Sequence, residues 1–474
     1  MVKLRPIPPC LLLGALLYGC APVGPDYVRP TVTTPAAFKE TAGWKLAQPA
    51  DNAPRGPWWR MFDDAELDAL ASQVAVNNQN VKAAEAGYRQ AQALLAQTRA
   101  GLVPTVTGNA SLNWSQQQSS STANSISHVY SVSLGLDWEI DVWGRIRRAI
   151  ESSESAAQAS AADLAAAQLA AQTTLVQSYL QICANDAQQR LYDDTVAAYQ
   201  RALDITRNRY QAGVAQKSDV TLAETQLNTA KAQAADLTIQ RAQLENAIAV
   251  LIGQPPALFA LAPRRDLPAP PAVPPALPSS LLERRPDVAA AERRVAAANA
   301  QIGVATAALY PAIALNASGG FVSSALSSLL SASHRYWALG PTLSTTLFDG
   351  GALQAQETQA IARYDQSVAA YRQTVLTAFQ EVEDNLAALV ALRTELDAAR
   401  AAERAAAETL RITQEQYKAG TVSYLNVAVV QNAYLSAQRS VLDGESRQLI
   451  ATVNLVSALG GGWQGLPSGQ AVPE

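Results

Sequence analysis

Residues 130–140 read Tyr-Ser-Val-Ser-Leu-Gly-Leu-Asp-Trp-Glu-Ile, and apolar and polar side chains alternate along this stretch. The even positions from Tyr130 to Ile140 are all apolar or aromatic, whereas serines and acids hold most of the odd positions. An alternation with a period of two is typical of a β-strand with one apolar and one polar face. We therefore expect a strand here that leads, after Asp141, into a new element.

Three further stretches alternate in the same way, at residues 105–114, 313–321 and 337–347. Strands of about 10 residues with this pattern are typical of transmembrane β-strands, which have lipid on one side and water on the other. Aromatic residues near the strand ends suit the two membrane interfaces; they are Trp114, Tyr130, Trp138, Phe321 and Trp337. A soluble sheet with one wet face explains the alternation equally well, so both interpretations stay open on periodicity alone.

The four strands are distributed two by two over the halves of an internal repeat. A shift of 207 positions superposes many residues without a gap, from Val81 on Val288 to Gly253 on Gly460. Each half is expected to contain a helix, two strands, a long helix, a glycine-containing turn and a second helix. The expected helices cover about 65–100, 144–209 and 217–252 in the first half and about 286–309, 352–418 and 424–459 in the second.

The repeat and its flanks predict the organisation of the chain. Successive prolines fix φ and remove N–H donors, so the connector between the halves should be extended and non-helical. The expected segments are a signal peptide at 1–19, an acylated extended arm at 20–62, the first repeat at 63–253, the Pro-rich connector at 254–280, the second repeat at 281–461 and a C-terminal tail at 462–474.

The long helices are too long for one small core. Each spans about 66 residues, which is ~100 Å at 1.5 Å per residue. In the second half, apolar side chains recur at alternating spacings of four and three, a coiled-coil period; they are Val375, Phe379, Val382, Leu386 and Leu389. Neighbouring helices could therefore form a cylindrical wall. An isolated coiled coil is the alternative, but it does not explain why strand pairs recur at the same place in both halves.

Four strands are too few to close a membrane barrel. The smallest single-chain outer-membrane barrels have about eight strands, and an open sheet edge leaves backbone groups unpaired in lipid. If these strands cross a membrane, several chains must share one barrel, and three chains of four strands would supply 12.

The N-terminus predicts a bacterial lipoprotein. Lys3 and Arg5 precede an apolar run at 10–18 that is too short for a membrane-spanning helix of ~20 residues. Leu17-Tyr-Gly-Cys20 resembles a lipobox, which predicts diacylglycerol on the Cys20 thiol and a further acyl chain such as palmitate. Ala21 at the next position permits export to the outer membrane. The alternative is an ordinary secretion signal with an incidental cysteine.

Charge and motif content argue against other classes of protein. The formal net charge is −4, so nothing points to a nucleic-acid partner. The only histidines are His128 and His334, without partners at metal-ligand spacing, and the chain lacks a serine nucleophile elbow, a Walker loop and a dinucleotide fingerprint. We therefore expect neither an enzyme nor a bound cofactor or metal, apart from the covalent lipid on Cys20.

Several blocks, in order along the mature chain, resemble one family, the TolC-like outer-membrane factors, in the lipoprotein branch of tripartite efflux systems. Each block is short, but together they cover almost the whole mature chain. They are Cys20-Ala-Pro-Val-Gly-Pro-Asp-Tyr-Val-Arg-Pro30, Trp58-Trp-Arg-Met-Phe-Asp-Asp-Ala-Glu-Leu67, Asp137-Trp-Glu-Ile-Asp-Val-Trp-Gly-Arg145, Leu281-Leu-Glu-Arg-Arg-Pro-Asp287, Ala291-Glu-Arg-Arg294, Ala297-Ala-Asn-Ala-Gln-Ile-Gly-Val304 and Phe348-Asp-Gly-Gly351.

The resemblance implies a mixed α and β fold that is completed in a homotrimer. Four transmembrane strands and long α-hairpins from each chain would form a shared 12-stranded β-barrel and a 12-helix periplasmic α-barrel. The protein would be a lipid-anchored exit duct in the outer membrane of a Gram-negative bacterium, with a large periplasmic portion. It would pass small molecules such as drugs, solvents or metal ions received from a periplasmic adaptor (membrane fusion) protein and an inner-membrane pump.

Two other functions stay open at this point. The same channel could serve a protein or peptide secretion system. A structural or adhesive lipoprotein is the second alternative, and it would form no conducting pore.

By resemblance, the turns that join the helices of each hairpin contact the adaptor. These tips are Gly213, Val214 and Ala215 in the first half and Gly420, Thr421 and Val422 in the second. The two glycines also suit left-handed helix ends, which is a purely structural explanation for them.

The resemblance places a periplasmic gate just after the second tip, at Leu425, Asn426 and Val429. Family members often carry aspartate at one or two of these positions, so we expect this gate to be apolar and nearly uncharged. Asp219 and Tyr417 are expected to take part in hydrogen bonds that lock neighbouring helices, although Val422 replaces an arginine that often joins them. Asp219 could equally act as an acid at a helix N-terminus.

Overall fold

The computed structural model describes residues 22–33, 35, 38–39, 57–117, 125–264, 267–271 and 285–461. The predicted signal peptide, Cys20, most of the second half of the connector and the C-terminal tail lie outside these residues. The chain divides into two compact units. The first contains Met1–Thr31, Gly87–Ser160 and Ala290–Arg372, and the second contains Val32–Ala86, Ala161–Ala289 and Gln373–Glu474. Each unit thus gathers segments from both halves of the repeat.

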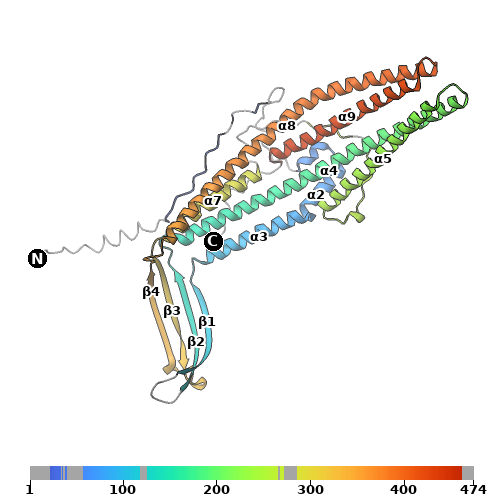
Figure 1. Ribbon diagram of the computed structural model, residues 1–474. Helices are drawn as coiled ribbons and strands as arrows, with labels where there is room; N and C mark the ends of the chain where they lie inside the picture. The colour runs from blue at the N-terminus through green and yellow to red at the C-terminus, as the bar shows by residue number, and fades with distance from the viewer. Residues whose placement is uncertain are drawn as a thin grey trace. The chain divides into compact units, whose positions relative to one another are not determined.

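The first unit contains one antiparallel sheet in the order β1-β2-β3-β4 (Figure 1). The strands are β1 (Thr105–Gln117), β2 (Ser125–Glu139), β3 (Ala312–Ser323) and β4 (Arg335–Ser344). All four predicted strands are confirmed. In the register, Thr105 pairs with Asp137 and Leu136 pairs with Ala317. Large apolar side chains on this sheet are exposed, among them Leu134 and Trp337, so the chain alone leaves an apolar sheet surface uncovered.

The helices match the predicted repeat closely. They are α2 (Ala65–Asn77), α3 (Gln79–Ala100), α4 (Arg145–Gln211), α5 (Lys217–Leu251), α7 (Pro286–Ala307), α8 (Ala352–Lys418) and α9 (Tyr424–Ala458). Both ends of α8 lie 207 positions after the ends of α4, and the same holds for α9 and α5. Within the described part of the chain, none of these helices combines the length and the hydrophobicity of a membrane span.

The single helix predicted at 65–100 is wrong, because Asn78 divides it into α2 and α3. Its Oδ1 accepts hydrogen bonds from the backbone N–H groups of Asn80 (3.0 Å) and Val81 (3.1 Å), which caps the N-terminus of α3. Its Nδ2 donates to the carbonyl oxygen of Leu251 at 2.8 Å. Asn78 therefore starts a new helix and also ties it to the end of α5.

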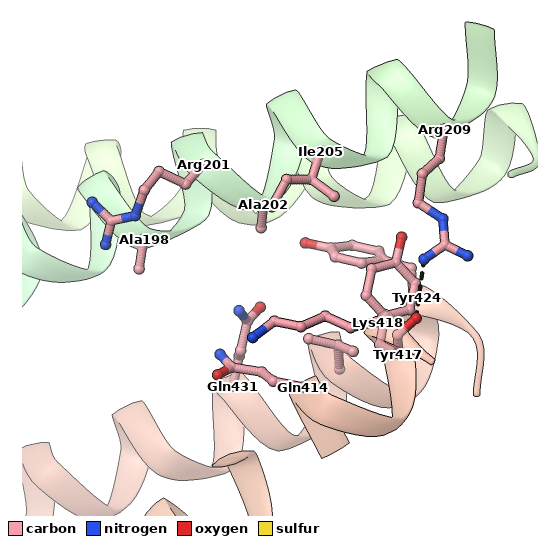
Figure 2. Close-up of a pocket in the computed structure, with 11 residues that line it drawn as sticks. Ala198, Arg201, Ala202, Ile205, Arg209, Gln414, Tyr417, Lys418, Tyr424 and Gln431 are labelled. Atoms are coloured by element: carbon pink, nitrogen blue, oxygen red, sulfur yellow. Dashed lines mark hydrogen bonds between the residues drawn. The ribbon is translucent and has the colours of Figure 1, made fainter. Parts of the chain in front are cut away.

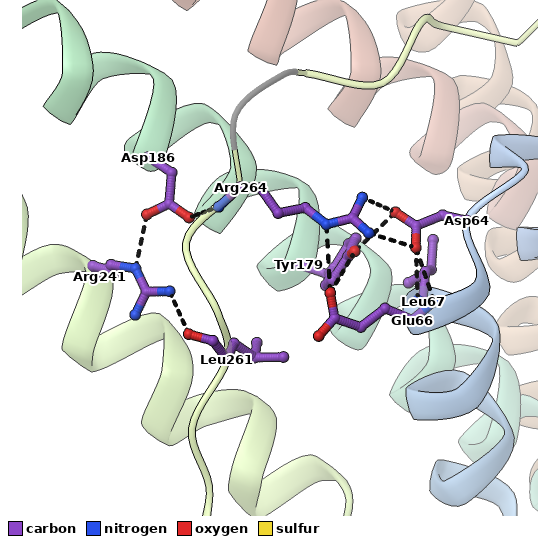
Figure 3. A network of polar contacts seen from close by, with 8 residues as sticks. All are labelled: Asp64, Glu66, Leu67, Tyr179, Asp186, Arg241, Leu261 and Arg264. Atoms are coloured by element: carbon purple, nitrogen blue, oxygen red, sulfur yellow. Dashed lines mark hydrogen bonds and ion pairs between the residues drawn. The ribbon is translucent and has the colours of Figure 1, made fainter.

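Asp64 is the centre of a polar network in the second unit (Figure 3). As the N-cap of α2, it accepts hydrogen bonds from the backbone N–H groups of Glu66 (3.0 Å) and Leu67 (3.1 Å). The Tyr179 hydroxyl on α4 donates to it at 2.8 Å, and the Arg264 guanidinium pairs with it. Its side chain is only 5% exposed. One carboxylate thus joins α2, α4 and the segment after α5.

A second carboxylate, Asp186 on α4, holds the same segment from the other side (Figure 3). Its two oxygens accept hydrogen bonds from Arg241 Nε (2.7 Å) and from the backbone N–H of Arg264 (2.9 Å). Arg241 on α5 also donates to the carbonyl oxygen of Leu261 at 2.8 Å. The start of the connector is therefore fixed across α4 and α5 by charged groups.

The described N-terminal residues form an extended arm in the first unit. The N–H of Val23 donates to the carbonyl oxygen of Trp143 at 3.0 Å, and Arg148 Nη2 donates to the carbonyl oxygen of Gly24 at 3.2 Å. Gly24 has φ +92°, and a Cβ there would lie 2.4 Å from the Cα of Gly303 on α7. Only glycine satisfies both the backbone conformation and the close approach.

Candidate functional site at the tips of the helical hairpins

The helical hairpins α4/α5 and α8/α9 end in the same kind of turn, and both turns belong to the second unit. Gly213 and Gly420 have φ +75° and +77°, and each N–H donates back to a tyrosine carbonyl, that of Tyr210 (2.9 Å) or Tyr417 (3.0 Å). A Cβ at either glycine would meet nothing within 4 Å. The left-handed backbone, rather than lack of space, therefore requires glycine at these helix ends.

The residues after the two glycines are accessible. Val214 and Thr421 are exposed, whereas Ala215 and Val422 are half-buried. An exposed valine at the end of a long hairpin provides a small apolar surface. The predicted role of the six tip residues in adaptor contact stays a prediction.

The predicted gate residues share one exposed face at the start of α9. Leu425 and Val429 are 55% and 59% exposed, and Asn426 is also exposed. Tyr424, just before these residues, and Val427, among them, are buried. Positions i, i+1 and i+4 lie on one side of a helix, so one face of α9 anchors the helix while the other presents two apolar side chains and an amide.

The anchored face of α9 is held by uncharged hydrogen bonds. Tyr424 donates to Gln226 Oε1 on α5 at 3.0 Å, and Gln226 Nε2 donates to the carbonyl oxygen of Ala428 at 3.1 Å. Tyr199 on α4 donates to Asn432 Oδ1 at 3.1 Å. Burial raises the pKa values of Tyr424 and Tyr199 to about 12, so both hydroxyls stay protonated donors at neutral pH.

The two predicted lock residues are not brought together by a hydrogen bond between the described residues. Asp219 Oδ2 accepts from the Gln216 N–H at 3.3 Å, so within this chain it caps the N-terminus of α5. Tyr417 instead meets Arg209 of α4 (Figure 2). The guanidinium lies 4.5 Å from the centre of the Tyr417 ring, and Nη1 donates to its carbonyl oxygen at 3.0 Å. The lock that Asp219 and Tyr417 would form between neighbouring helices stays a prediction.

Arg209 is the functional candidate that the sequence reasoning missed. Its contacts join the last turn of α4 to the last turn of α8, across the two hairpins. One feature of the sequence could have indicated Arg209. It precedes the first tip, whereas the matching position before the second tip, 207 residues later, is the uncharged Gln416.

Among all the residues that the structure describes, no group of three or more His, Cys, Asp or Glu side chains is placed to hold a metal ion.

Comparisons with known proteins identify the family. The family model described as outer membrane efflux protein matches residues 70–254 and 277–461. The probable efflux pump outer membrane protein TtgC of Pseudomonas putida is 33% identical over 94% of this chain and 94% of its own length. The outer membrane protein OprJ of Pseudomonas aeruginosa is 32% identical over 95% of both chains.

A solved structure of the outer-membrane channel OprN superposes with a TM-score of 0.86 at 32% identity, and the match covers 93% of this chain and 99% of that one. This confirms the predicted TolC-like fold and the location in the outer membrane. This chain belongs to the outer membrane efflux protein family, whose members are channel proteins.

Proposed function

We propose that this chain forms the outer-membrane exit duct of a tripartite efflux pump and acts as a passive channel without catalytic activity. The single observation that carries the proposal is the fold itself, in which an apolar-faced four-stranded sheet and two long helical hairpins occur in one chain. The curated relatives are named for efflux of antibiotics, toluene and cations. Drugs, solvents or metal ions are therefore the proposed cargo, and no observation favours protein secretion.

A homotrimer is the proposed working form. In one chain the sheet ends at β1 and β4, each of which has a single neighbouring strand. An unpaired strand edge is costly in lipid, so neighbouring copies must pair β1 with β4. Three chains would then share a barrel of 12 strands, and their hairpins would supply the 12 helices of the periplasmic α-barrel.

The position of the N-terminal arm supports the proposed lipid anchor. A Cβ at Gly144, between β2 and α4, would lie 2.4 Å from Pro22 Cβ. Pro22 follows Cys20 by two residues, and two residues span at most ~7 Å. A diacylglycerol on Cys20 would therefore start beside the end of the sheet, where the membrane interface is proposed to lie.

The thiols provide a test of this anchor. Cys183 on α4 is buried, and burial raises its pKa to about 12. The pKa of Cys183 in the folded protein lies above its unfolded value of about 8.5. The stability that the buried, protonated thiol contributes is therefore complete below pH ~8.5 and is lost as the pH rises toward 12.

The number of reactive thiols tests the lipid anchor. We expect no maleimide-reactive thiol in the native mature protein at pH 7, and one per chain after denaturation. Two reactive thiols after denaturation would contradict acylation of Cys20.

The proposed partners are a periplasmic adaptor at the six tip residues and an inner-membrane pump beyond it. Affinity purification of the native complex from cross-linked cells, through a tag after Glu474, should recover both. A matched variant with Val214→Asp and Thr421→Asp places charge on both tips without changing a buried side chain, and it should lose the adaptor but keep the trimer. Equal recovery of the adaptor with this variant would contradict the assignment of the tips.

A further inference from the structure

A groove of about 340 Å³ lies between α4 and the α8/α9 hairpin, next to the tips (Figure 2). This volume is within the range of small-molecule sites, which is ~300–1,000 Å³. Figure 2 shows the rings of Tyr417 and Tyr424 near Arg209, while Gln431 lies farther along the groove. Aliphatic side chains complete the walls; they are Ala198, Ala202, Ile205 and Val427.

Two of the residues that line this groove each contain a polar atom that is buried without a hydrogen-bond partner in the described part of the chain. The two atoms are the hydroxyl of Tyr417 and Oε1 of Gln431. Gln431 is only 7% exposed. Leaving a buried polar group without a partner is unfavourable, so such groups usually have a partner that satisfies them. One atom is a hydroxyl that can donate, and the other is an acceptor that needs a donor.

The charges around the groove have one sign. Three cations line it, Arg201, Arg209 and Lys418, and no carboxylate is among the lining residues. Lys418 is neutralised by Glu415 at 2.8 Å. Arg209 binds a carbonyl oxygen and a ring rather than an acid. A ligand with negative charge is therefore complementary to this site.

We propose that this groove binds a small aromatic hydroxy acid. The aromatic body would lie against the tyrosine rings and the aliphatic wall. The carboxylate would sit near Arg209 and accept the hydrogen bond of the Tyr417 hydroxyl, while the ligand hydroxyl would donate to Gln431 Oε1. This arrangement satisfies both orphaned atoms and the unpaired positive charge with one molecule.

Three matched probes test the site on the purified full-length protein in detergent, by titration calorimetry: 6-hydroxy-2-naphthoate, 2-naphthoate and 2-naphthol. The first should bind most tightly. Tyr417→Phe should weaken both carboxylates about tenfold and leave 2-naphthol unchanged, because hydrogen bonds to charged groups are the stronger ones. Gln431→Leu should weaken both hydroxylated probes about threefold to tenfold and leave 2-naphthoate unchanged.

Each variant removes an atom that has no partner, so neither should lower the thermal stability of the protein. Tyr434→Phe, on α9 outside the groove lining, is the matched control and should leave all three affinities unchanged. If a substitution at Tyr417 or Gln431 disturbs folding, Arg209→Gln replaces it and should weaken only the two carboxylates, because the carboxylate is placed beside Arg209. The proposal is overturned if none of the three probes binds at 1 mM. It is also overturned if the probes bind but Tyr417→Phe does not selectively weaken the carboxylates and Gln431→Leu does not selectively weaken the hydroxylated probes.

Because α4 belongs to one hairpin and α8 and α9 to the other, a bound ligand bridges the two hairpins. This prediction rests on the proposed channel function: 6-hydroxy-2-naphthoate should lower the open probability of the wild-type pore. Calorimetry needs no pore, so failure of the channel proposal and failure of the binding site are distinguishable. Unchanged opening at saturating probe would overturn the bridging role.

Discussion

Asp64→Ala is expected to lower the free energy of unfolding by about 3–5 kcal/mol. The substitution removes the N-cap of α2, which is worth about 1 kcal/mol. It also leaves the buried Tyr179 hydroxyl without its 2.8 Å acceptor and removes one of the two ion-pair partners of Arg264, which keeps Glu66 at 3.4 Å. Denaturant-induced unfolding of the purified protein in detergent, followed by tyrosine and tryptophan fluorescence, measures the change.

Asp204→Ala is the matched control because it removes the same side chain from an exposed helix position. Asp204 on α4 accepts a hydrogen bond from Gln200 Nε2 at 3.1 Å, and such exposed i,i+4 pairs contribute about 0.2–0.5 kcal/mol. If both variants lost the same stability, the network around Asp64 would not be the connection between α2, α4 and the connector that its geometry indicates.

Asn426→Asp is expected to make the pore sensitive to block by trivalent cations. In a trimer, one new carboxylate per chain would form a ring of three on the axis, and rings of acids are strong cation sites in channels. The wild-type face contains Leu425, Asn426 and Val429, none of which is ionisable. We expect La³⁺ to block the variant at a concentration at least about tenfold lower than the concentration that blocks the wild type. This difference corresponds to roughly 1.4 kcal/mol in the free energy of La³⁺ binding.

The block should weaken as the pH falls toward the ordinary carboxylate pKa of about 4, because protonation removes the ring charge. Asn228→Asp, at an exposed position on α5, adds the same charge outside the proposed gate and serves as the control. Equal block of both variants would mean that position 426 does not face the conducting path.

The elements could be predicted from the sequence because their signals are local and occur twice. Alternation at 130–140 marks β2, and the 207-residue shift transfers each element to the second half, as the bounds of α4 and α8 illustrate. The division at Asn78 was missed, although an asparagine that caps the next two residues is a local signal; its amide contact with the end of α5 is the part that only the structure shows.

The site was predicted only in part for the same reason. The family resemblance indicated Leu425, Asn426 and Val429 as gate positions, and the structure shows them on one exposed face. The contact of Arg209 with Tyr417 joins residues about 200 positions apart, and so does the pair of Asp64 with Arg264. Sequence periodicity carries no information on such long-range partners.

Single-channel recording in planar bilayers tests whether this chain forms a trimeric pore. Purified trimers of the wild type should form a pore of low, gated conductance. Leu425→Ala combined with Val429→Ala removes the two exposed apolar side chains of the gate face and should increase conductance several-fold, because a hydrophobic constriction closes by side-chain bulk and dewetting. A protein that stays monomeric and never conducts, even with both substitutions, would contradict the account.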